Sequence, residues 1–549
     1  MRATMQEVFD GLEVVSQNRW PSLKFDVGEV NDKLSRALPA GFYYKTFMWP
    51  KGFWDALYEP VIRRAAGLGT APVEIDPDRY AARYAHADVL VVGAGPAGLA
   101  AALAAGRAGA DVILVDEHPQ PGGALLSDSE TTIDGLDGAA FAARVLAELE
   151  SLPNVRVLAR TTGIAHDHQN MVICAERLID HLAHPPEGAP RERLWRVRAA
   201  EVVHAQGAVE RPMVFAGNDR PGVMLAGAAL TYLERFGVAV GREVAVATTH
   251  DSAYRTAFAL ADAGISVAAV ADARSSVAED LLAAAKARGI EVMTGVLPTG
   301  TRGRLRVRGV ALSGGQRIAC EALLMCGGWT PSVHLHSHTK GKLHWTGEAF
   351  VPKETSERAQ SAGASTGLWG INAALTSGAA AGKAAAEKAG FSGKAVAFRV
   401  DGEREDGGVA PAPGVGKKAF VDFQNDVTAK DIRLAVGEGM RSIEHVKRYT
   451  TNGMATDQGK TSNINALVIA AETLQKSPPD VGLTTFRPPF TPVTFGAVAN
   501  HHRGVGFTPL RKTPVDAWAA DQGAVFEPVG EWRRARYFPE GEETMHAAV

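Results

Sequence analysis

Short apolar runs alternate with alanine-rich stretches along the first half of the chain. The runs Asp88–Val92 and Asp111–Val115 have the composition of buried parallel strands, and Leu99–Ala105 between them predicts a helix. The same strand, helix and strand are expected again at Glu243–Ala247, about Ser252–Ala263 and Ile265–Val270. The pattern therefore predicts an α/β fold with two strand–helix–strand units, one after the other.

The second half of the chain changes character twice. Residues 321–330 predict another apolar strand that ends in glycines, and residues 363–389 predict a glycine turn followed by a long alanine-rich helix. Residues 401–418 combine charge with glycine and proline, as flexible linkers do. A helical unit is expected next, because Thr428 and Asp431 form a capping-box signal ahead of amphipathic stripes.

These patterns divide the chain into successive segments. Residues 1–86 hold a dense aromatic run, which we interpret as an arm packed against the next domain; a partner-binding surface is the alternative. The segments are the N-terminal arm 1–86, the first dinucleotide-binding domain 87–240, an inserted degenerate dinucleotide-binding-like domain 241–340, the return of the first domain 341–400, the linker 401–418, a helical cluster-less ferredoxin-like domain 419–477 and a Pro-rich, irregular C-terminal extension 478–549.

A glycine-rich turn lies between the first predicted strand and its helix. In Gly93-Ala-Gly95-Pro-Ala-Gly98 the first glycine permits a tight turn, the second lets the backbone approach a pyrophosphate, and the third lets helix and strand pack closely. The following helix presents free N–H groups and the positive end of its dipole. Asp116 and Glu117 end the second strand, where a carboxylate binds ribose hydroxyls and repels a 2′-phosphate. NAD or FAD therefore fits better than NADP.

The corresponding turn of the second unit differs. Thr248-Thr-His-Asp-Ser-Ala-Tyr254 contains no glycine, so a pyrophosphate would meet side chains where it needs bare backbone. We predict that this second site is degenerate.

The two units together resemble the flavin-dependent pyridine nucleotide-disulfide reductases, in which the second unit is inserted in the first. Gln206-Gly-Ala208 fits the point where that family leaves its first domain, and Gly363-Ala364 fits the point of return. The family usually has an aspartate for the flavin's ribityl chain where this chain has Ala364, which favours NAD over FAD. Disulfide reductase chemistry is excluded because no CxxC is present.

Residues 421–470 resemble the helical domain of bacterioferritin-associated ferredoxins. Alignment places the four cluster-ligand positions at Asp422, Gln424, Asp457 and Ser462. Because iron–sulfur clusters need thiolates, we expect the scaffold without the cluster. The turn from Asp457 to Ser462 lacks the spacing of a phosphate loop, and we interpret it as a packing or flavin-contacting turn.

Composition narrows the function further. The 549 residues are 46% hydrophobic and 22% charged, as in globular proteins, and the net charge of −3 argues against nucleic acid or an acidic membrane as partner. Three cysteines form neither a disulfide framework nor a metal set, which indicates a reduced, cytoplasmic protein. The uncharged stretch from Val89 to Gly106 is broken by glycines and proline, so a membrane span is a poor interpretation.

The alternating histidines His334, His336 and His338 would share one face of a strand. We favour an exposed strand end or loop over a metal site, because no carboxylate or cysteine nearby completes a ligand set. We predict no metal site and assign no catalytic residue.

Several specific runs identify the chain as resembling the alpha subunit of heterotetrameric sarcosine oxidase over essentially its whole length. The runs are Gln17–Leu23, Gly41–Pro50, Tyr58–Pro60, Val209–Gly222 and Lys447–Thr450 through Gly459–Thr461. The resemblance implies NAD at the first dinucleotide site, partner beta, gamma and delta subunits, FAD in the beta subunit, and FMN where alpha meets beta. The implied reaction converts sarcosine to glycine with hydrogen peroxide and formaldehyde, or methylene-tetrahydrofolate.

The resemblance also implies a set of cofactor-binding residues, of which the last four named are the weaker expectations. They are Gly93, Gly95, Ala97, Gly98, Asp116, Glu117, Gly123, Ala364, His118, Ala124, Trp369 and Ile371.

Two departures from the family accompany the resemblance. Most of the N-terminal ferredoxin-like domain of such subunits is missing, and the chain stops where the folate-binding aminomethyltransferase-like domain should begin. We expect a fragment or one half of a split subunit, with tetrahydrofolate bound only through the missing domain. A subunit of a related opine or amino-acid dehydrogenase or of hydrogen cyanide synthase is the alternative, and a non-catalytic NAD-binding scaffold is another.

Overall fold

We describe the fold from a computed structural model of the chain. The structure describes residues 6–16, 19–30, 40–66, 73–402, 406–412, 414 and 416–548. Parts of the expected N-terminal arm and of the expected linker, and two residues of the run Gln17–Leu23, therefore lie outside the described residues.

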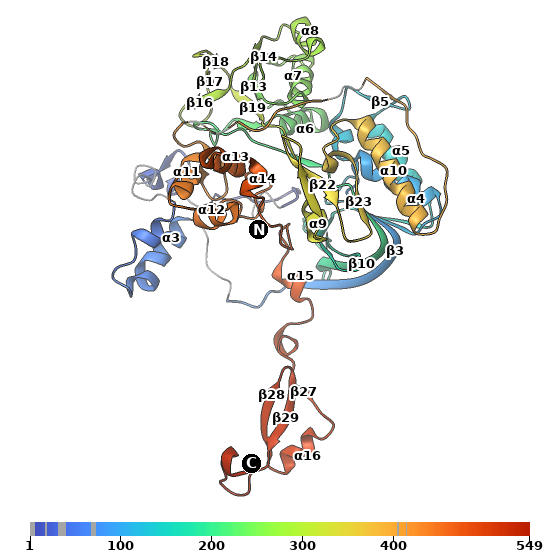
Figure 1. Cartoon of the computed structure of the whole chain (residues 1–549), viewed down its shortest axis with the longest axis vertical. Coiled ribbons are helices and arrows are strands. Elements are labelled where there is room, and N and C mark those ends of the chain that lie inside the picture. Colours follow the sequence, from blue (N-terminus) through green and yellow to red (C-terminus); the bar gives the residue numbers. More distant parts are fainter. Residues whose placement is uncertain are drawn as a thin grey trace.

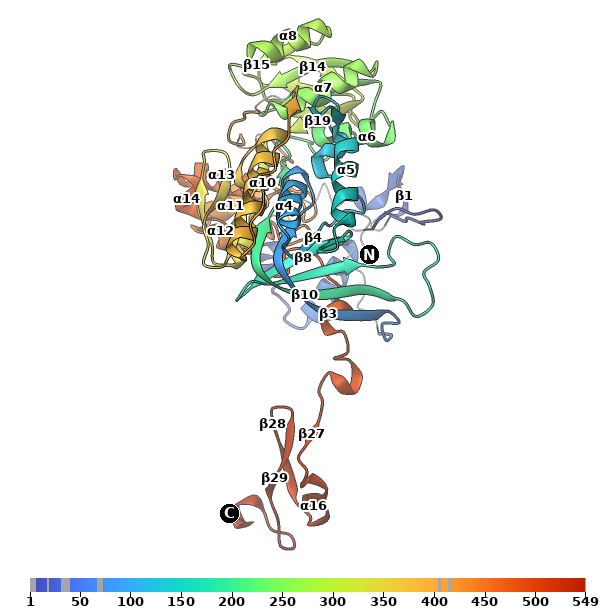
Figure 2. The same cartoon turned by 90° about the vertical axis from the view of Figure 1, so that its right-hand side faces the viewer.

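A large, strongly curved sheet forms the base of the first unit (Figures 1 and 2). Its central strands β3 and β10 are parallel, and β4 and β7 continue the parallel part, while β9 and β8 pair antiparallel on the other side. The strands are β3 (Arg79–Val92), β4 (Val112–Val115), β7 (Val155–Leu158), β8 (Thr161–Asp167), β9 (Met171–Arg177) and β10 (Pro190–His204).

Strand β3 begins at Arg79, well before the predicted Asp88. Its first half pairs with β10 but is partly exposed, so it lacks the apolar run that marks its second half. The boundary predicted at residue 86 therefore falls inside this strand.

The chain returns to the first sheet after the second unit, as predicted. Strand β23 (Ala359–Ser361) pairs parallel with β10, and helix α10 (Ile371–Lys388) packs on α4 (Pro96–Arg107). These two helices and α5 (Gly138–Ser151) lie together over the sheet (Figure 2). A Cβ atom at Gly378 or Gly382 of α10 would overlap backbone of α4, so the bare glycines let the two helices touch.

The second unit has a parallel five-stranded sheet in the order β12-β19-β13-β14-β15. Its elements are β12 (Val223–Leu225), α6 (Ala226–Phe236), β13 (Glu243–Thr248), α7 (Ser252–Asp262), β14 (Ser266–Asp272), α8 (Glu279–Ala287), β15 (Val292–Thr294) and β19 (Ala322–Cys326), with the side sheet β16 (Pro298–Arg302), β17 (Gly309–Leu312) and β18 (Arg317–Ala319). The predicted insertion of one dinucleotide-type unit in another is confirmed.

Two short antiparallel strands connect the units. Strand β11 (Ala208–Glu210) leaves the first unit and pairs with β20 (Trp329–Pro331), which leads back. The side chain of Arg211 is buried at this crossing and donates to the carbonyl oxygens of Gly327 (3.0 Å) and Trp329 (2.5 Å). The guanidinium thereby ties the outgoing and returning strands together.

The helical unit forms a separate core. Its elements are β25 (Phe420–Asp422), β26 (Val427–Thr428), α11 (Ala429–Gly437), α12 (Ile443–Thr450), α13 (Asn463–Leu474) and α14 (Pro478–Val481). The predicted capping box is present: the backbone N–H of Thr428 donates to the carboxylate of Asp431 at 2.9 Å.

The C-terminal segment is more ordered than predicted. After α15 (Phe495–Ala499) the chain builds the sheet β27-β29-β28 beside α16 (Asp516–Asp521), set apart from the rest of the molecule (Figure 1). Its strands are β27 (Arg511–Lys512), β28 (Val525–Val529) and β29 (Trp532–Tyr537). The expectation of an irregular region was wrong here, because short, half-exposed strands give little hydrophobic signal.

The N-terminal arm exposes part of its aromatic run. It contains β1 (Pro21–Ser22), β2 (Phe25–Asp26), α2 (Phe42–Lys45), a π-helical turn at Trp54–Tyr58 and α3 (Glu59–Ala65). Lys45 pairs with Glu438 of the helical unit, but Trp49 is 82% and Phe53 48% exposed. Phe47 contacts the rings of Phe42 and Tyr58 within the arm. The packing of the aromatic run against the next domain stays a prediction.

Candidate functional site

The glycine turn after β3 has the geometry that a dinucleotide pyrophosphate needs. Gly93 has φ +100°, and a Cβ atom there would overlap the carbonyl oxygen of Ala205. A Cβ at Gly98 would overlap the Gly93 carbonyl oxygen. A Cβ at Gly95 would instead meet nothing nearer than the Cα of Gly123, at 4.0 Å. Two glycines are thus required by packing, and Gly95 opens space for a ligand.

A second glycine pair flanks this space. The Gly122 N–H donates to the Ala94 carbonyl oxygen at 2.8 Å, and a Cβ at Gly123 would lie 2.9 Å from the Gly95 Cα. Gly123 and Ala124 are exposed and begin a short 3₁₀ turn. The two loops are therefore in direct contact beside Gly95.

The two adjacent carboxylates at the end of β4 have different surroundings. Asp116 is 8% exposed, and its oxygens accept hydrogen bonds from the backbone N–H groups of Ala94 (2.6 Å) and His118 (2.8 Å). The side chains of Glu117 and His118 are exposed by 57% and 65%. Asp116 thus fixes the glycine turn, and the carboxylate of Glu117 is open to solvent.

The remaining predicted residues, most of them in the return segment, differ in how deeply they are buried. Ala364 lies in the 3₁₀ turn Gly363–Thr366, and a Cβ at Gly363 would lie 2.7 Å from the Cβ of Ala97. Ala97 and Ile371 are each 5% exposed and belong to the core, so a ligand would meet their backbone. Trp369 is half-buried, and its ring stands edge-on to His250 of the second unit, with centroids 6.0 Å apart. The contacts of Ala97, Ala364, Trp369 and Ile371 with a cofactor stay predictions.

A cavity between the crossing strands, the helical unit and the C-terminal segment is lined by His334, Lys460 and Phe490, among others. The ring of His334 stacks on Phe490, and its Nε2 lies 2.9 Å from Nε2 of Gln206. Lys460 Nζ donates to the Phe490 carbonyl oxygen at 2.7 Å and lies 4.2 Å from the centre of its ring. Burial lowers the pKa of Lys460. In the sequence Lys460 lies between Gly459 and Thr461, in the turn from Asp457 to Ser462, and this position was the one indication of a functional role.

Three of the four cluster-ligand positions of the helical unit, Asp422, Gln424 and Asp457, have side chains in hydrogen bonds, whereas the buried hydroxyl of Ser462 has no hydrogen-bond partner among the described residues. Asp422 accepts from the backbone N–H groups of Gln424 (2.8 Å) and Gly453 (2.7 Å). Asp457 accepts from the Gly459 N–H at 3.0 Å and from the Thr461 hydroxyl at 3.0 Å. The Asp422 carboxylate thus connects its own loop to the loop at Gly453, and the Asp457 carboxylate closes the turn in which it lies.

The alternating histidines do not lie on a strand. Residues His334–His338 form the short helix α9, which packs on β8, and His334 and His336 are buried. Alternation predicted a strand, but Ser337 and Thr339 hydrogen-bond back to Val333 and His336, which closes a helical turn. Among the described residues, no three His, Cys, Asp or Glu side chains are grouped to hold a metal ion. Within the same residues, no helix is both long and apolar enough to cross a bilayer.

The turn after β13 in the second unit is filled by side chains. The Thr248 hydroxyl accepts from the His250 N–H (2.9 Å) and donates to its carbonyl oxygen (2.7 Å). Thr249 and His250 are each 1% exposed. This turn has no gap like that at Gly95.

Comparison with known proteins agrees with both units. Residues 416–502 match the sarcosine oxidase A3 domain, and residues 87–356 match the pyridine nucleotide-disulphide oxidoreductase family. Over 100% of its length the chain is 50% identical to the alpha subunit of sarcosine oxidase from Rhizobium meliloti (strain 1021), covering 56% of that protein. The chain is a homologue of the alpha subunit of sarcosine oxidase.

Other relatives of this sarcosine oxidase alpha homologue are more distant. A subunit of opine oxidase from Rhizobium meliloti is 29% identical over 75% of this chain and 87% of its own. The crystal structure of L-proline dehydrogenase from P. horikoshii shares the fold, with a TM-score of 0.59 and 19% identity over 78% of this chain and 82% of the other. The chain spans about half the length of the sarcosine oxidase subunits it matches.

Proposed function

We propose that the chain is the NAD-binding part of the alpha subunit of a sarcosine oxidase complex. The complex would oxidise sarcosine and water with oxygen to glycine, formaldehyde and hydrogen peroxide, or pass the one-carbon unit to tetrahydrofolate. The relationship to the sarcosine oxidase alpha subunits supports this proposal, and three buried, free cysteines suit a reduced cytoplasm.

One observation carries the assignment of the nucleotide. The open space at Gly95 lies beside the exposed carboxylate of Glu117, so pyrophosphate and adenosine ribose fit together at the end of the first sheet. The N–H groups at the start of α4 would hold the phosphates, with Gly123 and Ala124 on the opposite wall. Ala364 and Trp369 would approach from the return segment. A carboxylate at Glu117 disfavours a 2′-phosphate and supports NAD rather than NADP.

The flavins of the proposed complex lie outside the residues that this chain supplies for NAD. FAD would be held by the beta subunit, while FMN would lie where alpha and beta meet, with gamma and delta completing the assembly. Bound flavin supplies the electron transfer from amine to oxygen. The described residues of this chain orient NAD, and we assign none of them a proton-transfer role.

The test is identification of the nucleotide that purifies with the full chain. After acid release and mass spectrometry we expect NAD at about one equivalent and no visible flavin absorbance. The variant Gly95→Val should lose the nucleotide, because its side chain fills the pyrophosphate space. Gly300→Ala is the control, since its methyl group meets Ala216 only at ordinary contact distance (3.5 Å). Release of FAD instead would contradict the NAD assignment.

Two alternatives predict different results. A related opine or amino-acid dehydrogenase would oxidise its own amine rather than sarcosine when partner subunits are added, and the 29% relationship to opine oxidase keeps this candidate second. A non-catalytic scaffold would bind NAD without turning it over. We expect no steady-state NADH oxidation by the isolated chain, and such turnover would count against the scaffold.

A further inference from the structure

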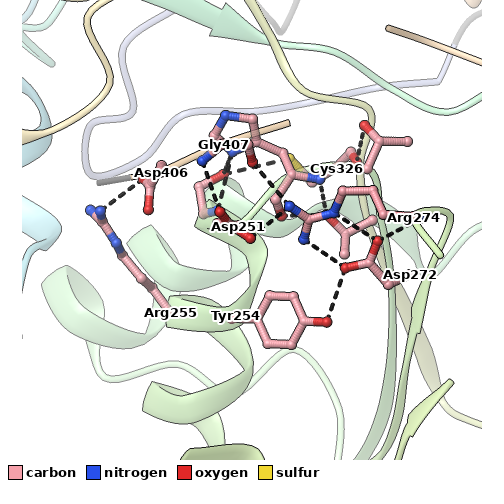
Figure 3. A network of polar contacts seen from close by, with 12 residues as sticks. Asp251, Tyr254, Arg255, Asp272, Arg274, Cys326, Asp406 and Gly407 are labelled. Atoms are coloured by element: carbon pink, nitrogen blue, oxygen red, sulfur yellow. Dashed lines mark hydrogen bonds and ion pairs between the residues drawn. The ribbon is translucent and has the colours of Figure 1, made fainter. Parts of the chain in front are cut away.

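In open α/β sheets, ligands bind outside the carboxyl ends of the parallel strands. In the second unit this edge carries the turn Thr249–Asp251, which follows β13, and the side chains of Asp272 and Arg274 at the end of β14 (Figure 3). Arg274 stands where an arginine meets a 2′-phosphate in dinucleotide-binding units, so the edge is polar and placed for a nucleotide.

A segment of the chain's own linker lies across this edge. The Gly407 N–H donates to the Asp251 carboxylate at 2.8 Å, and the Asp251 N–H donates to the Gly407 carbonyl oxygen at 2.9 Å. The Val409 N–H donates to the Thr249 carbonyl oxygen at 3.1 Å, which continues the pairing. Next to the start of α7, the Asp251 N–H thus meets a peptide carbonyl where a bound nucleotide would present phosphate.

The charged side chains of the edge are also engaged. Arg274 pairs with Asp272 and with Asp251, each at 2.7 Å, and donates to the Gly407 carbonyl oxygen at 3.2 Å. Arg255 of α7 pairs with Asp406 at 2.7 Å, and the Asp406 side chain is 6% exposed. The cations that would attract a nucleotide are therefore neutralised within the chain, one of them by the linker itself.

The linker segment packs most tightly against the second unit at Gly408. A Cβ atom there would overlap the imidazole of His250 and lie 3.3 Å from the Thr249 carbonyl oxygen. At the neighbouring Gly407 a Cβ would meet only the Asp251 carboxylate, at 3.5 Å. Neither glycine has a positive φ, so this difference comes from packing rather than from backbone conformation.

We propose that Asp406–Val409 is the internal ligand of the second unit. The segment occupies the dinucleotide edge by backbone pairing, closes it to free nucleotides and anchors the linker that carries the helical unit. The proposal goes beyond the function proposed above, and it does not rest on NAD binding at the first site.

Hydrogen–deuterium exchange of the full chain tests the anchoring. The amides of Asp251, Gly407 and Val409 should exchange slowly in the wild type and in Gly407→Ala. They should exchange about tenfold faster in Gly408→Ala, where one methyl group displaces the segment. Asp406→Ala leaves the His250 contact unaltered and should also speed exchange of the Gly407 amide, which keeps the test valid if Gly408→Ala fails to fold. Equal rates in all four proteins would overturn the proposal.

Added nucleotide tests the closure. We expect saturating NADH or NADPH to leave the exchange of these amides in the wild type unchanged, whatever happens at the first site. Faster exchange of the Gly407 and Val409 amides with nucleotide would show that the segment is displaced, and the proposal would be wrong. Loss of NAD at the first site would affect amides near Gly95 instead, so the two failures are distinguishable.

Discussion

At the scale of single residues, the glycine turn was predictable and the roles of its neighbouring acids were not. A Cβ atom at Gly98 would overlap backbone within the motif, at Gly93, whereas a Cβ atom at Gly93 would overlap backbone of Ala205, which directly follows the neighbouring strand β10. Adjacent side chains of a strand point to opposite faces, and the sequence alone does not say which of Asp116 and Glu117 faces inward. The structure shows Asp116 bound to the turn and Glu117 in solvent.

The difference gives opposite predictions for two similar substitutions. Glu117→Gln should weaken NAD binding about tenfold and leave the thermal midpoint unchanged, because its carboxylate holds no part of the fold. Asp116→Asn should lower the thermal midpoint even without nucleotide, because an amide replaces the carboxylate that two backbone N–H groups need. Isothermal titration and thermal unfolding of both variants check this. Unchanged NAD affinity in Glu117→Gln would remove this residue from the site.

At the scale of elements, the sequence predicted the continuously apolar strands and helices but not several other elements. The strand Asp88–Val92 and the helix after it were expected because both are continuously apolar. The half-exposed start of β3 and the strands β27–β29 were missed, because partial burial leaves no regular apolar period. The buried helix α9 was missed because alternating histidines suggested a strand. The close contact of α4 and α10 depends on Gly378 and Gly382 of α10. Because these glycines are far from α4 in the sequence, no local pattern predicts the contact.

That contact predicts opposite effects of the same substitution in two helices. Gly382→Ala should destabilise the protein by about 1–3 kcal/mol, because the methyl group overlaps the Ala101 backbone of α4. Gly437→Ala, at the end of α11, meets nothing within 4 Å and should stabilise by about 0.5–1 kcal/mol through helix propensity. Denaturant unfolding of both variants is the measurement. Equal stability of the two would mean that α4 and α10 are not in this close contact.

At the scale of the whole molecule, the insertion of the second unit in the first could be predicted from a family resemblance. The contacts between the units could not be predicted. The linker segment Asp406–Val409 carries no hydrophobic signal, so its place on the second unit could not be predicted. The crossing strands also contain a buried carboxyl group that could not be predicted. Glu210 accepts a hydrogen bond from the Gly227 N–H at 2.8 Å, and burial raises the pKa of Glu210 to about 7.

This buried carboxyl makes the junction sensitive to pH. Because the folded pKa of Glu210 is raised, the folded state holds the proton more tightly than the unfolded chain. The stability that protonated Glu210 contributes is fully present below the pKa of Glu210 in the unfolded chain. It is lost as the pH rises through about 7. Relative to Glu210→Gln, the wild type should lose about 3 kcal/mol of stability between pH 4.5 and 8.

Thermal unfolding at several pH values measures the difference between these two proteins. Glu243→Gln is the control, since Glu243 is exposed at the start of β13, and its difference from wild type should not change with pH in this way. A constant gap between wild type and Glu210→Gln across this range would contradict the prediction.

The pairing of α4 with α10 also sets an order of events during synthesis. The ribosome makes α4 long before α10, and the whole second unit is translated in between. At about 5–20 residues per second, the face of α4 that α10 covers stays uncovered for roughly ten to fifty seconds. The inserted unit has all of its strands available earlier, so it completes its sheet first and the enclosing unit last. A nascent chain halted before Ile371 would thus present an inner unit with a complete sheet and an outer unit still open to chaperones.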